Sequence, residues 1–244
     1  MESKTRIKWL DSVDSTNDEL LRHLPSHDNL SVVAAVEQFA GRGQRGNHWL
    51  SKPGDNLTFS LLLRPEGLPA RDIMSVTFLS TLVIRDWLRE EGAPALVKWP
   101  NDLYVGNRKI CGMLIENGLA EGMVAWSVIG IGINLNQTDF PGELVNPVSL
   151  KRITGKDYDP KMALERICDR FETRLPDLSG NLDRLRDEYC DGLFQSGVPR
   201  PYRDLLTDEE FMGTIKGVTR EGRLLMDRDG TQVSYAFKEV GYIL

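Results

Sequence analysis

The chain has 244 residues, of which 41% are hydrophobic and 27% are charged, and its formal net charge is −6. This balance is typical of a globular protein that buries a substantial core, and no run of about 18 apolar residues exists that could span a bilayer. An acidic balance also argues against a broad nucleic-acid surface, which needs a basic face to displace the counterions of phosphates. We therefore expect neither a membrane nor a nucleic acid as a partner.

The cysteines and the N-terminus exclude further classes. Cys111, Cys168 and Cys190 are odd in number and far apart, with no Cys-x-x-Cys spacing, so neither a disulfide framework nor a zinc site is expected. Residues 1–8 lack the apolar core of a signal peptide. Together these features predict a cytoplasmic protein with three free thiols.

The N-terminal part of the chain predicts a helix between strands. An apolar segment at 7–10 precedes Thr16 and Glu19, whose spacing is that of a capping box at a helix start. The apolar runs 32–36 and 57–63 predict two buried strands, with a long glycine-rich loop between them.

The middle of the chain predicts a helix followed by strands. Residues 72–91 carry apolar side chains at helical spacing and end at Gly92, which predicts a helix packed on the core. Turns are expected at Gly106–Asn107 and Asn117–Gly118. The four strands expected here are 96–99, 103–105, 108–116 and 123–135.

The C-terminal part predicts two helices and then a small β-domain. The helices are expected at about 160–175 and 181–190. Short alternating strands after them indicate a small β-barrel of the SH3 type. These strands are 211–217, 222–227, 231–237 and 240–244, with turns at Glu221–Gly222 and Asp229–Gly230. We therefore divide the chain into a larger N-terminal domain, 1–200, and a barrel, 201–244.

Lys109 occupies an unusual position on its predicted strand. Strict alternation places Lys109 on the same face as Cys111, Met113 and Ile115. An ammonium group among apolar side chains is partly desolvated, which is unfavourable unless an anion completes the site. The alternative is a lysine whose apolar stem covers its neighbours while its head reaches water.

Two more segments combine a strand with polar groups at its end or on one face. Lys98 points opposite to its strand neighbours, and Asn101 and Asp102 follow where Pro100 ends the strand, either as turn residues or as site residues. In the strand at 130–136, the residues opposite the apolar face are Gly130, Gly132, Asn134 and Asn136. A bare glycine face indicates either a flat ligand near the backbone or close packing by a helix or loop.

The glycine-rich loop combines backbone amides, cations and an aromatic ring. It is neither a Walker loop nor a dinucleotide fingerprint, because the segment that follows predicts loop and strand instead of a helix. A solvated linker is the alternative, although a tryptophan is an unfavourable residue to expose in one. The groups are Gly41, Gly43 and Gly46, the cations Arg42 and Arg45, and the ring of Trp49.

Five motifs follow one another along the chain. They are Asp-Ser-Thr-Asn (14–17), Glu-Gln-x-x-Gly-Arg-Gly-x-x-Gly-x-x-Trp (37–49), Lys-Trp-Pro-Asn-Asp (98–102), Arg-Lys-Ile-Cys-Gly (108–112) and Gly-Ile-Gly-Ile-Asn (130–134). This set resembles the biotin protein ligases, the biotin–[acetyl-CoA-carboxylase] ligase family, over essentially the whole chain. The resemblance implies an α+β fold, in which a mixed β-sheet catalytic domain is backed by helices and joined to a small C-terminal SH3-like β-barrel. The same sheet occurs in lipoate ligases and class II aminoacyl-tRNA synthetases.

The resemblance also implies roles for individual residues, with ATP, Mg²⁺ and biotin as the small molecules bound. Lys109 and Arg42 are expected to be catalytic, and Asp102 is expected to contact the metal. The residues expected to bind biotin are Ser15, Thr16, Gln38, Gly41, Arg42, Lys109 and Gly112. Those expected to bind ATP are Arg45, Trp49, Lys98, Asn101 and Asn134.

The implied reaction has two steps. The biotin carboxylate attacks the α-phosphorus of ATP and releases pyrophosphate, and a carrier-protein lysine then attacks biotinyl-5′-AMP and expels AMP. The expected partner is the biotin carboxyl carrier domain of a biotin-dependent carboxylase. Because the motifs begin at Asp14, we expect a monofunctional ligase without an N-terminal DNA-binding domain, as a monomer or a homodimer.

One departure and two rival functions complete the prediction. Where the family usually has arginine, this chain has Gln44, followed by Arg45. A lipoate or octanoate ligase would share the fold and the chemistry, but the loop ending in Trp49 and the Lys-Trp-Pro-Asn-Asp motif favour biotin. Lys109 and Arg42 argue against a module that binds without catalysis.

Overall fold

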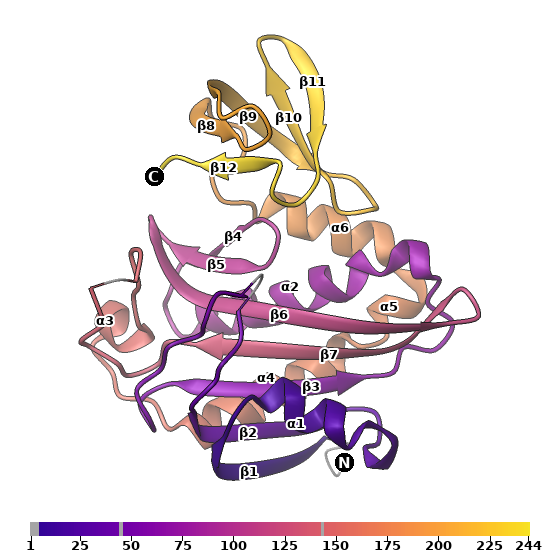
Figure 1. Cartoon of the computed structure of the whole chain (residues 1–244), viewed down its shortest axis with the longest axis vertical. Coiled ribbons are helices and arrows are strands. Elements are labelled where there is room, and N and C mark those ends of the chain that lie inside the picture. The colour runs from indigo at the N-terminus through magenta and orange to yellow at the C-terminus, as the bar shows by residue number, and fades with distance from the viewer. Residues whose placement is uncertain (1–4, 44–45, 143) are drawn as a thin grey trace.

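The computed structural model describes residues 5–43, 46–142 and 144–244, which form two β-sheets with helices around the larger one (Figure 1). The larger sheet has seven strands in the order β1-β2-β3-β7-β6-β5-β4. Only β1 and β2 run parallel, so the sheet is mixed. Its strands are β1 (Arg6–Val13), β2 (Ser31–Gln38), β3 (Leu57–Leu63), β4 (Leu96–Lys98), β5 (Asp102–Val105), β6 (Arg108–Ala120) and β7 (Met123–Ile133).

Helices lie on both faces of this sheet. In Figure 1, α1 lies in front of the sheet, and α2 and α4 lie behind it. None of the helices in the described part of the chain combines the length and apolarity that a bilayer crossing requires. The helices are α1 (Thr16–Arg22), α2 (Met74–Glu90), α3 (Leu150–Thr154), α4 (Pro160–Arg174), α5 (Asp177–Gly180) and α6 (Leu182–Asp191), with 3₁₀ turns at Leu24–Ser26 and Ala70–Asp72.

The sheet has a hydrophobic core on each face because its central strands are apolar on both sides. On the α1 face, Leu20 packs with Val33, Leu62 and Val128, all of them fully buried. The larger core lies on the other face and includes α2, α4 and α6, with Trp87 among its largest buried side chains. Near-continuous apolar runs are what strands buried on both faces require. The smaller core thereby fixes α1, and the site residues beside it, to the sheet.

The C-terminal strands form a separate antiparallel sheet in the order β11-β10-β9-β8-β12. Polar contacts join it to the rest: for example, Trp99 Nε1 donates to the Gly222 carbonyl at 3.0 Å, and Arg220 pairs with the buried Asp72, with one N–O distance of 2.9 Å. The strands are β8 (Arg200–Asp204), β9 (Glu210–Val218), β10 (Leu224–Arg228), β11 (Thr231–Tyr235) and β12 (Val240–Tyr242). A mixed sheet with helices and a second antiparallel sheet confirms the predicted fold class. The domain boundary at residue 200 stays a prediction.

Two local predictions were wrong. Ser15, not Thr16, caps α1, because its hydroxyl accepts from the Asp18 N–H at 3.4 Å. Asn117 and Gly118 lie inside β6, and the hairpin turn comes later, at Glu121–Gly122, where both residues have positive φ. Glycine is needed at 118 for another reason: a Cβ there would lie 2.2 Å from the Trp126 ring.

Candidate active site

A cavity of about 340 Å³ lies between one face of the larger sheet and the C-terminal sheet. Its walls come from α1, β2, the glycine-rich loop and the strands β4 to β7. The C-terminal sheet and its loops add Phe237, Lys238, Gly241 and Tyr242, which sequence reasoning missed. Nothing in the C-terminal sequence marks these residues, because only the packing of one sheet against the other brings them to the cavity.

The glycines of β7 form the floor of this cavity, and side chains from elsewhere lie directly on them. A Cβ at Gly130 would lie 2.2 Å from Asn17 Oδ1, and a Cβ at Gly132 would lie 2.2 Å from the Trp49 ring. Such distances exclude any larger residue unless the neighbour moves. The predicted alternation is confirmed, and close packing by a helix and a loop accounts for the bare face.

Trp49 lies across the floor with its indole N–H buried. The ring also passes within 3.2 Å of a Cβ built at Gly112. Among the described residues, Nε1 of Trp49 has no hydrogen-bond acceptor. A buried donor without a partner is uncommon and marks a place where a ligand or water supplies one.

Lys109 reaches the cavity because β6 contains a bulge. Tyr104 pairs with Lys109 while Leu103 pairs with Cys111, so Ile110 is an extra residue on β6. The bulge turns Lys109 onto the face of Gly112, where its Nζ lies 2.9 Å from the position that a Cβ on Gly112 would take. The predicted placement among apolar side chains is therefore wrong, because strict alternation does not hold across a bulge.

An acid partners Lys109 inside the cavity. Lys109 Nζ lies 2.7 Å from Asp102 Oδ1, and both side chains are about a quarter to a third exposed (31% and 26%). Asn101, at the turn before Asp102, donates its side-chain amide to the Met113 carbonyl and so ties that turn to β6. The pair holds the ammonium group over the glycine floor.

Lys98 lies deeper, between aromatic rings. Its Nζ donates to the Tyr104 hydroxyl at 3.2 Å and lies 4.7 Å and 5.0 Å from the ring centres of Tyr104 and Tyr242. Burial lowers the pKa of the Lys98 ammonium group, since desolvation disfavours its charge. The C-terminal sheet therefore completes the surroundings of this lysine.

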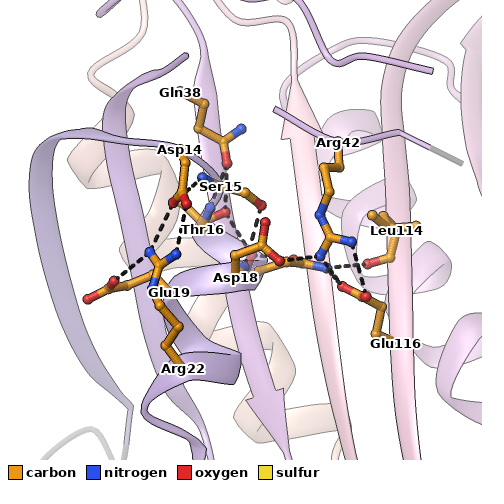
Figure 2. Close-up of polar contacts among 12 residues, drawn as sticks. Asp14, Ser15, Thr16, Asp18, Glu19, Arg22, Gln38, Arg42, Leu114 and Glu116 are labelled. Atoms are coloured by element: carbon orange, nitrogen blue, oxygen red, sulfur yellow. Dashed lines mark hydrogen bonds and ion pairs between the residues drawn. The ribbon is translucent and has the colours of Figure 1, made fainter. Parts of the chain in front are cut away.

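A hydrogen-bonded group of side chains forms the other end of the cavity (Figure 2). Gln38 Oε1 accepts from the backbone N–H of Thr16 at 2.8 Å and contacts its hydroxyl at 3.0 Å. The same hydroxyl lies 2.7 Å from Ser60 Oγ, which donates to Asn17 Oδ1 at 2.5 Å. These contacts orient Thr16 and Gln38 toward the cavity, which both of them line.

Arg42 joins this group through an acid on β6. Asn17 Nδ2 donates to Glu116 Oε2 at 2.8 Å, and Arg42 Nη2 lies 2.7 Å from the same oxygen (Figure 2). Arg42 also contacts Asp18 Oδ1 at 2.7 Å. Glu116 was missed because a lone acid near the end of a strand carries no signal of its partner 74 residues away.

The structure brings most of the predicted site residues into one cavity. Ser15 caps α1 and, like Gly41 and Asn134, is absent from the described lining; the Asn134 amide donates to the Val148 carbonyl at 3.1 Å. Arg45 and Gln44 lie outside the described residues. The predicted residues that line the cavity are Thr16, Gln38, Arg42, Trp49, Lys98, Asn101, Asp102, Lys109 and Gly112.

A glycine floor with a polar pocket at one end and with Lys98 and Lys109 at the other defines a site that can bind a ligand with an anionic group. Comparison with known proteins gives the protein family. The chain belongs to the biotin/lipoate A/B protein ligase family, whose model matches residues 9–134.

Individual relatives match over most of the chain. The bifunctional ligase/repressor BirA of Escherichia coli (strain K12) is 33% identical over 230 residues, which are 92% of this chain and 70% of that protein. The biotin–[acetyl-CoA-carboxylase] ligase of Paracoccus denitrificans is 35% identical over 165 residues, 65% of this chain and 68% of that one. Among solved structures, biotin protein ligase from Aquifex aeolicus in complex with biotin and ATP matches with a TM-score of 0.81 and 26% identity, covering 97% of both chains.

Proposed function

We propose that the protein is an ATP-dependent biotin protein ligase, which converts biotin to biotinyl-5′-AMP and transfers the biotinyl group to a lysine of a biotin carboxyl carrier domain. The observation that carries this proposal is a single cavity that holds the polar pocket of Thr16 and Gln38 together with the ammonium group of Lys109. The similarity to a ligase solved with biotin and ATP supports it.

The polar pocket suits the ring of biotin. Gln38 Oε1 is occupied by the Thr16 N–H at 2.8 Å, so the amide N–H groups of Gln38 are the donors that a ligand carbonyl would meet. The Thr16 hydroxyl has lone pairs that accept from a ligand N–H. The ureido ring of biotin presents one carbonyl between two N–H groups, which matches this pair.

The opposite end of the cavity suits the reacting groups. Adenylation brings a carboxylate against a phosphate, so its barrier falls when a fixed cation neutralises the charge that develops. Lys109 is the cation that the sheet positions, and Arg42 stands beside the polar pocket. Trp49 would offer the adenylate an aromatic face and an N–H that has no acceptor in the described part of the chain. Neither step requires a protein nucleophile.

Asp102, an acid that lines this cavity, is suited to bind Mg²⁺. In the described part of the chain, no three His, Cys, Asp or Glu side chains come together as a metal-binding group. Mg²⁺ that accompanies a nucleotide takes one or two carboxylates, with phosphate and water oxygens as its other ligands. Asp102 would provide such a carboxylate, and the ion would offset negative charge on the phosphates.

The acceptor and the setting follow from the same proposal. The names of the relatives point to a carboxylase, so the partner would be its biotin carboxyl carrier domain. The cavity is lined by residues of both sheets, and the carrier lysine would have to enter it to reach the adenylate. A cytoplasmic setting stays a prediction from the sequence.

The test is incubation of the protein with ATP, Mg²⁺, labelled biotin and a biotin carboxyl carrier domain. We expect label on one lysine of the carrier and pyrophosphate release that depends on biotin. A carrier domain in which that lysine is replaced by arginine is the control. Unlabelled lipoate added in excess should not compete. Labelling suppressed by lipoate would instead identify a lipoate ligase of the same family.

A further inference from the structure

The guanidinium group of Arg42 is held between two carboxylates from distant parts of the chain (Figure 2). Its Nη2 lies 2.7 Å from Asp18 Oδ1 on α1 and 2.7 Å from Glu116 Oε2 on β6. Its Nη1 makes a longer contact of 3.3 Å with Glu116 Oε1. One cation between two acids leaves the cluster with a net negative charge.

This arrangement conflicts with anion binding by Arg42. A guanidinium group recognises a carboxylate or phosphate through two parallel N–H bonds on one edge. Glu116 already occupies one edge of Arg42, and Asp18 takes the remaining hydrogen of Nη2. An incoming anion must therefore displace one of the two acids before it can form such a pair.

The two acids differ in what else they hold. Glu116 also accepts from Asn17 Nδ2 at 2.8 Å, and Asn17 packs on Gly130 as part of the cavity wall. The Asp18 carboxylate contacts only Arg42 among the side chains that the structure describes. Loss of the Asp18 contact would leave the wall intact, whereas loss of the Glu116 contact would loosen it.

We propose that Asp18 is an exchangeable partner of Arg42: it holds the guanidinium group when no ligand is bound and gives way to the carboxylate or phosphate of the ligand. Glu116 keeps Arg42 at the cavity wall in both states. The proposal rests on the proposed function, because the displacing anion is that of biotin or of its adenylate. Asp18 is thus a positioning residue that acts through Arg42, and it lowers the affinity for biotin by competing with it.

The chain contains a matched control on the same helix. Arg22 is also held by two carboxylates, with its Nη1 2.7 Å from Asp14 and its Nη2 2.9 Å from Glu19 (Figure 2). This second cluster lies outside the cavity lining given by the described residues. Asp18→Asn and Glu19→Gln therefore remove the same kind of charge from neighbouring positions, but only the first affects Arg42.

The first measurement needs no ligand. Phenylglyoxal modifies an arginine more slowly when acids hold its guanidinium group. Mass spectrometry of the digested protein gives the modification rate at each arginine. We expect Asp18→Asn to raise the rate at Arg42 and leave Arg22 unchanged, and Glu19→Gln to do the reverse. The change should be about twofold to fivefold, the range for a solvent-exposed ion pair. An unchanged rate at Arg42 in Asp18→Asn would overturn the proposal.

The second measurement is calorimetric titration with biotin. Asp18→Asn should bind biotin about twofold to fivefold more tightly than the wild type, and Glu19→Gln should match the wild type. Glu116→Gln should bind biotin more weakly, because its loss loosens Asn17. Weaker or unchanged binding in Asp18→Asn would refute the exchange. If the wild type bound no biotin, the proposed function would fail, and the modification rates would still decide whether Asp18 holds Arg42.

Discussion

Two of the cations that line the cavity, Lys109 and Arg42, are held in different ways. Lys109 lies on a strand, and both of its backbone groups are hydrogen-bonded: its N–H donates to the Asn146 carbonyl at 2.8 Å, and its carbonyl accepts from the Val148 N–H at 2.9 Å. Arg42 lies on a loop and is held by exposed ion pairs with Asp18 and Glu116. The first cation has its backbone fixed in the sheet and pairs with Asp102 of the adjacent strand β5, whereas the second pairs with acids from two separate elements, of which a ligand can replace one. A fixed charge suits transition-state stabilisation, and an exchangeable one suits binding.

The largest effect should follow from removal of the fixed cation. Lys109→Ala should cost about 3 kcal/mol or more in the barrier to adenylation, because a charge-assisted contact to the developing charge is lost. The measurement is biotin-dependent pyrophosphate release. Arg108→Ala, at the exposed neighbouring position, is the control and should behave as the wild type. Near-normal release by Lys109→Ala would remove the distinction between the two cations.

Trp49→Ala tests whether the indole ring binds the nucleotide. Its removal should weaken ATP binding by about 1–3 kcal/mol, the usual value for one aromatic ring stacked on a base. Biotin binding should fall less, because the indole lies over Gly132 and Gly112, whereas the polar pocket is formed by Gln38 and Thr16. Separate titrations with biotin and with a non-hydrolysable ATP analogue measure both. A greater loss for biotin would contradict the assignment of Trp49 to the nucleotide.

Gly130→Ala tests whether the position of Arg42 depends on the glycine floor of the cavity. A Cβ there meets Asn17 Oδ1 at 2.2 Å, so Asn17 and its hydrogen bond to Glu116 must shift. We expect a loss of about 1–2 kcal/mol in the free energy of unfolding and weaker biotin binding.

The control is Gly118→Ala, which meets the Trp126 ring at the same 2.2 Å, and neither Gly118 nor Trp126 belongs to the described cavity lining. It should cost similar stability, measured by urea unfolding, and leave biotin binding unchanged. Equal biotin affinities in the two variants would show that Asn17 does not support the pocket.

The smallest effect is expected at Gln44. Gln44→Arg adds a cation two residues after Arg42 in the sequence, and because the Arg42 side chain is 38% exposed, we expect solvent to limit the gain to about 1 kcal/mol or less. Gln44→Arg should release preformed labelled adenylate more slowly and label fewer lysines of an unrelated protein. If its release rate equals that of the wild type, Arg45 already provides the charge. Arg45→Ala should then release the adenylate faster than the wild type, and the double variant Gln44→Arg, Arg45→Ala should restore the wild-type release rate.

The sequence predicted the elements that local pattern controls. The strand expected at 57–63 is β3 with the same bounds, and the glycine face of β7 follows from alternation alone. The motifs also predicted that Thr16, Gln38 and Lys109 belong to one site, and all three residues line the cavity. Each of these depends on neighbours within a few residues or on an apolar period.

The rest depended on contacts between distant segments. The predicted strand face of Lys109 was wrong because a bulge at Ile110 adds one residue to β6, and no residue propensity indicates such a bulge. Asn117–Gly118 has the composition of a turn, but the partner strand continues past it and Trp126 needs the space. The role of Glu116 and the lining by Tyr242 could be recognised only once the strands were placed side by side.

The position of Trp49 has a practical consequence for measurement. Of the five tryptophans, Trp49 and Trp99 line the cavity, and the Trp49 ring lies on its glycine floor with the ammonium group of Lys109 6.0 Å from its centre. A ligand that enters changes both the polarity around this ring and the distance of the nearest charge. Intrinsic fluorescence therefore reports occupancy of the site without any label, and the difference between wild type and Trp49→Phe isolates that signal from the other four rings.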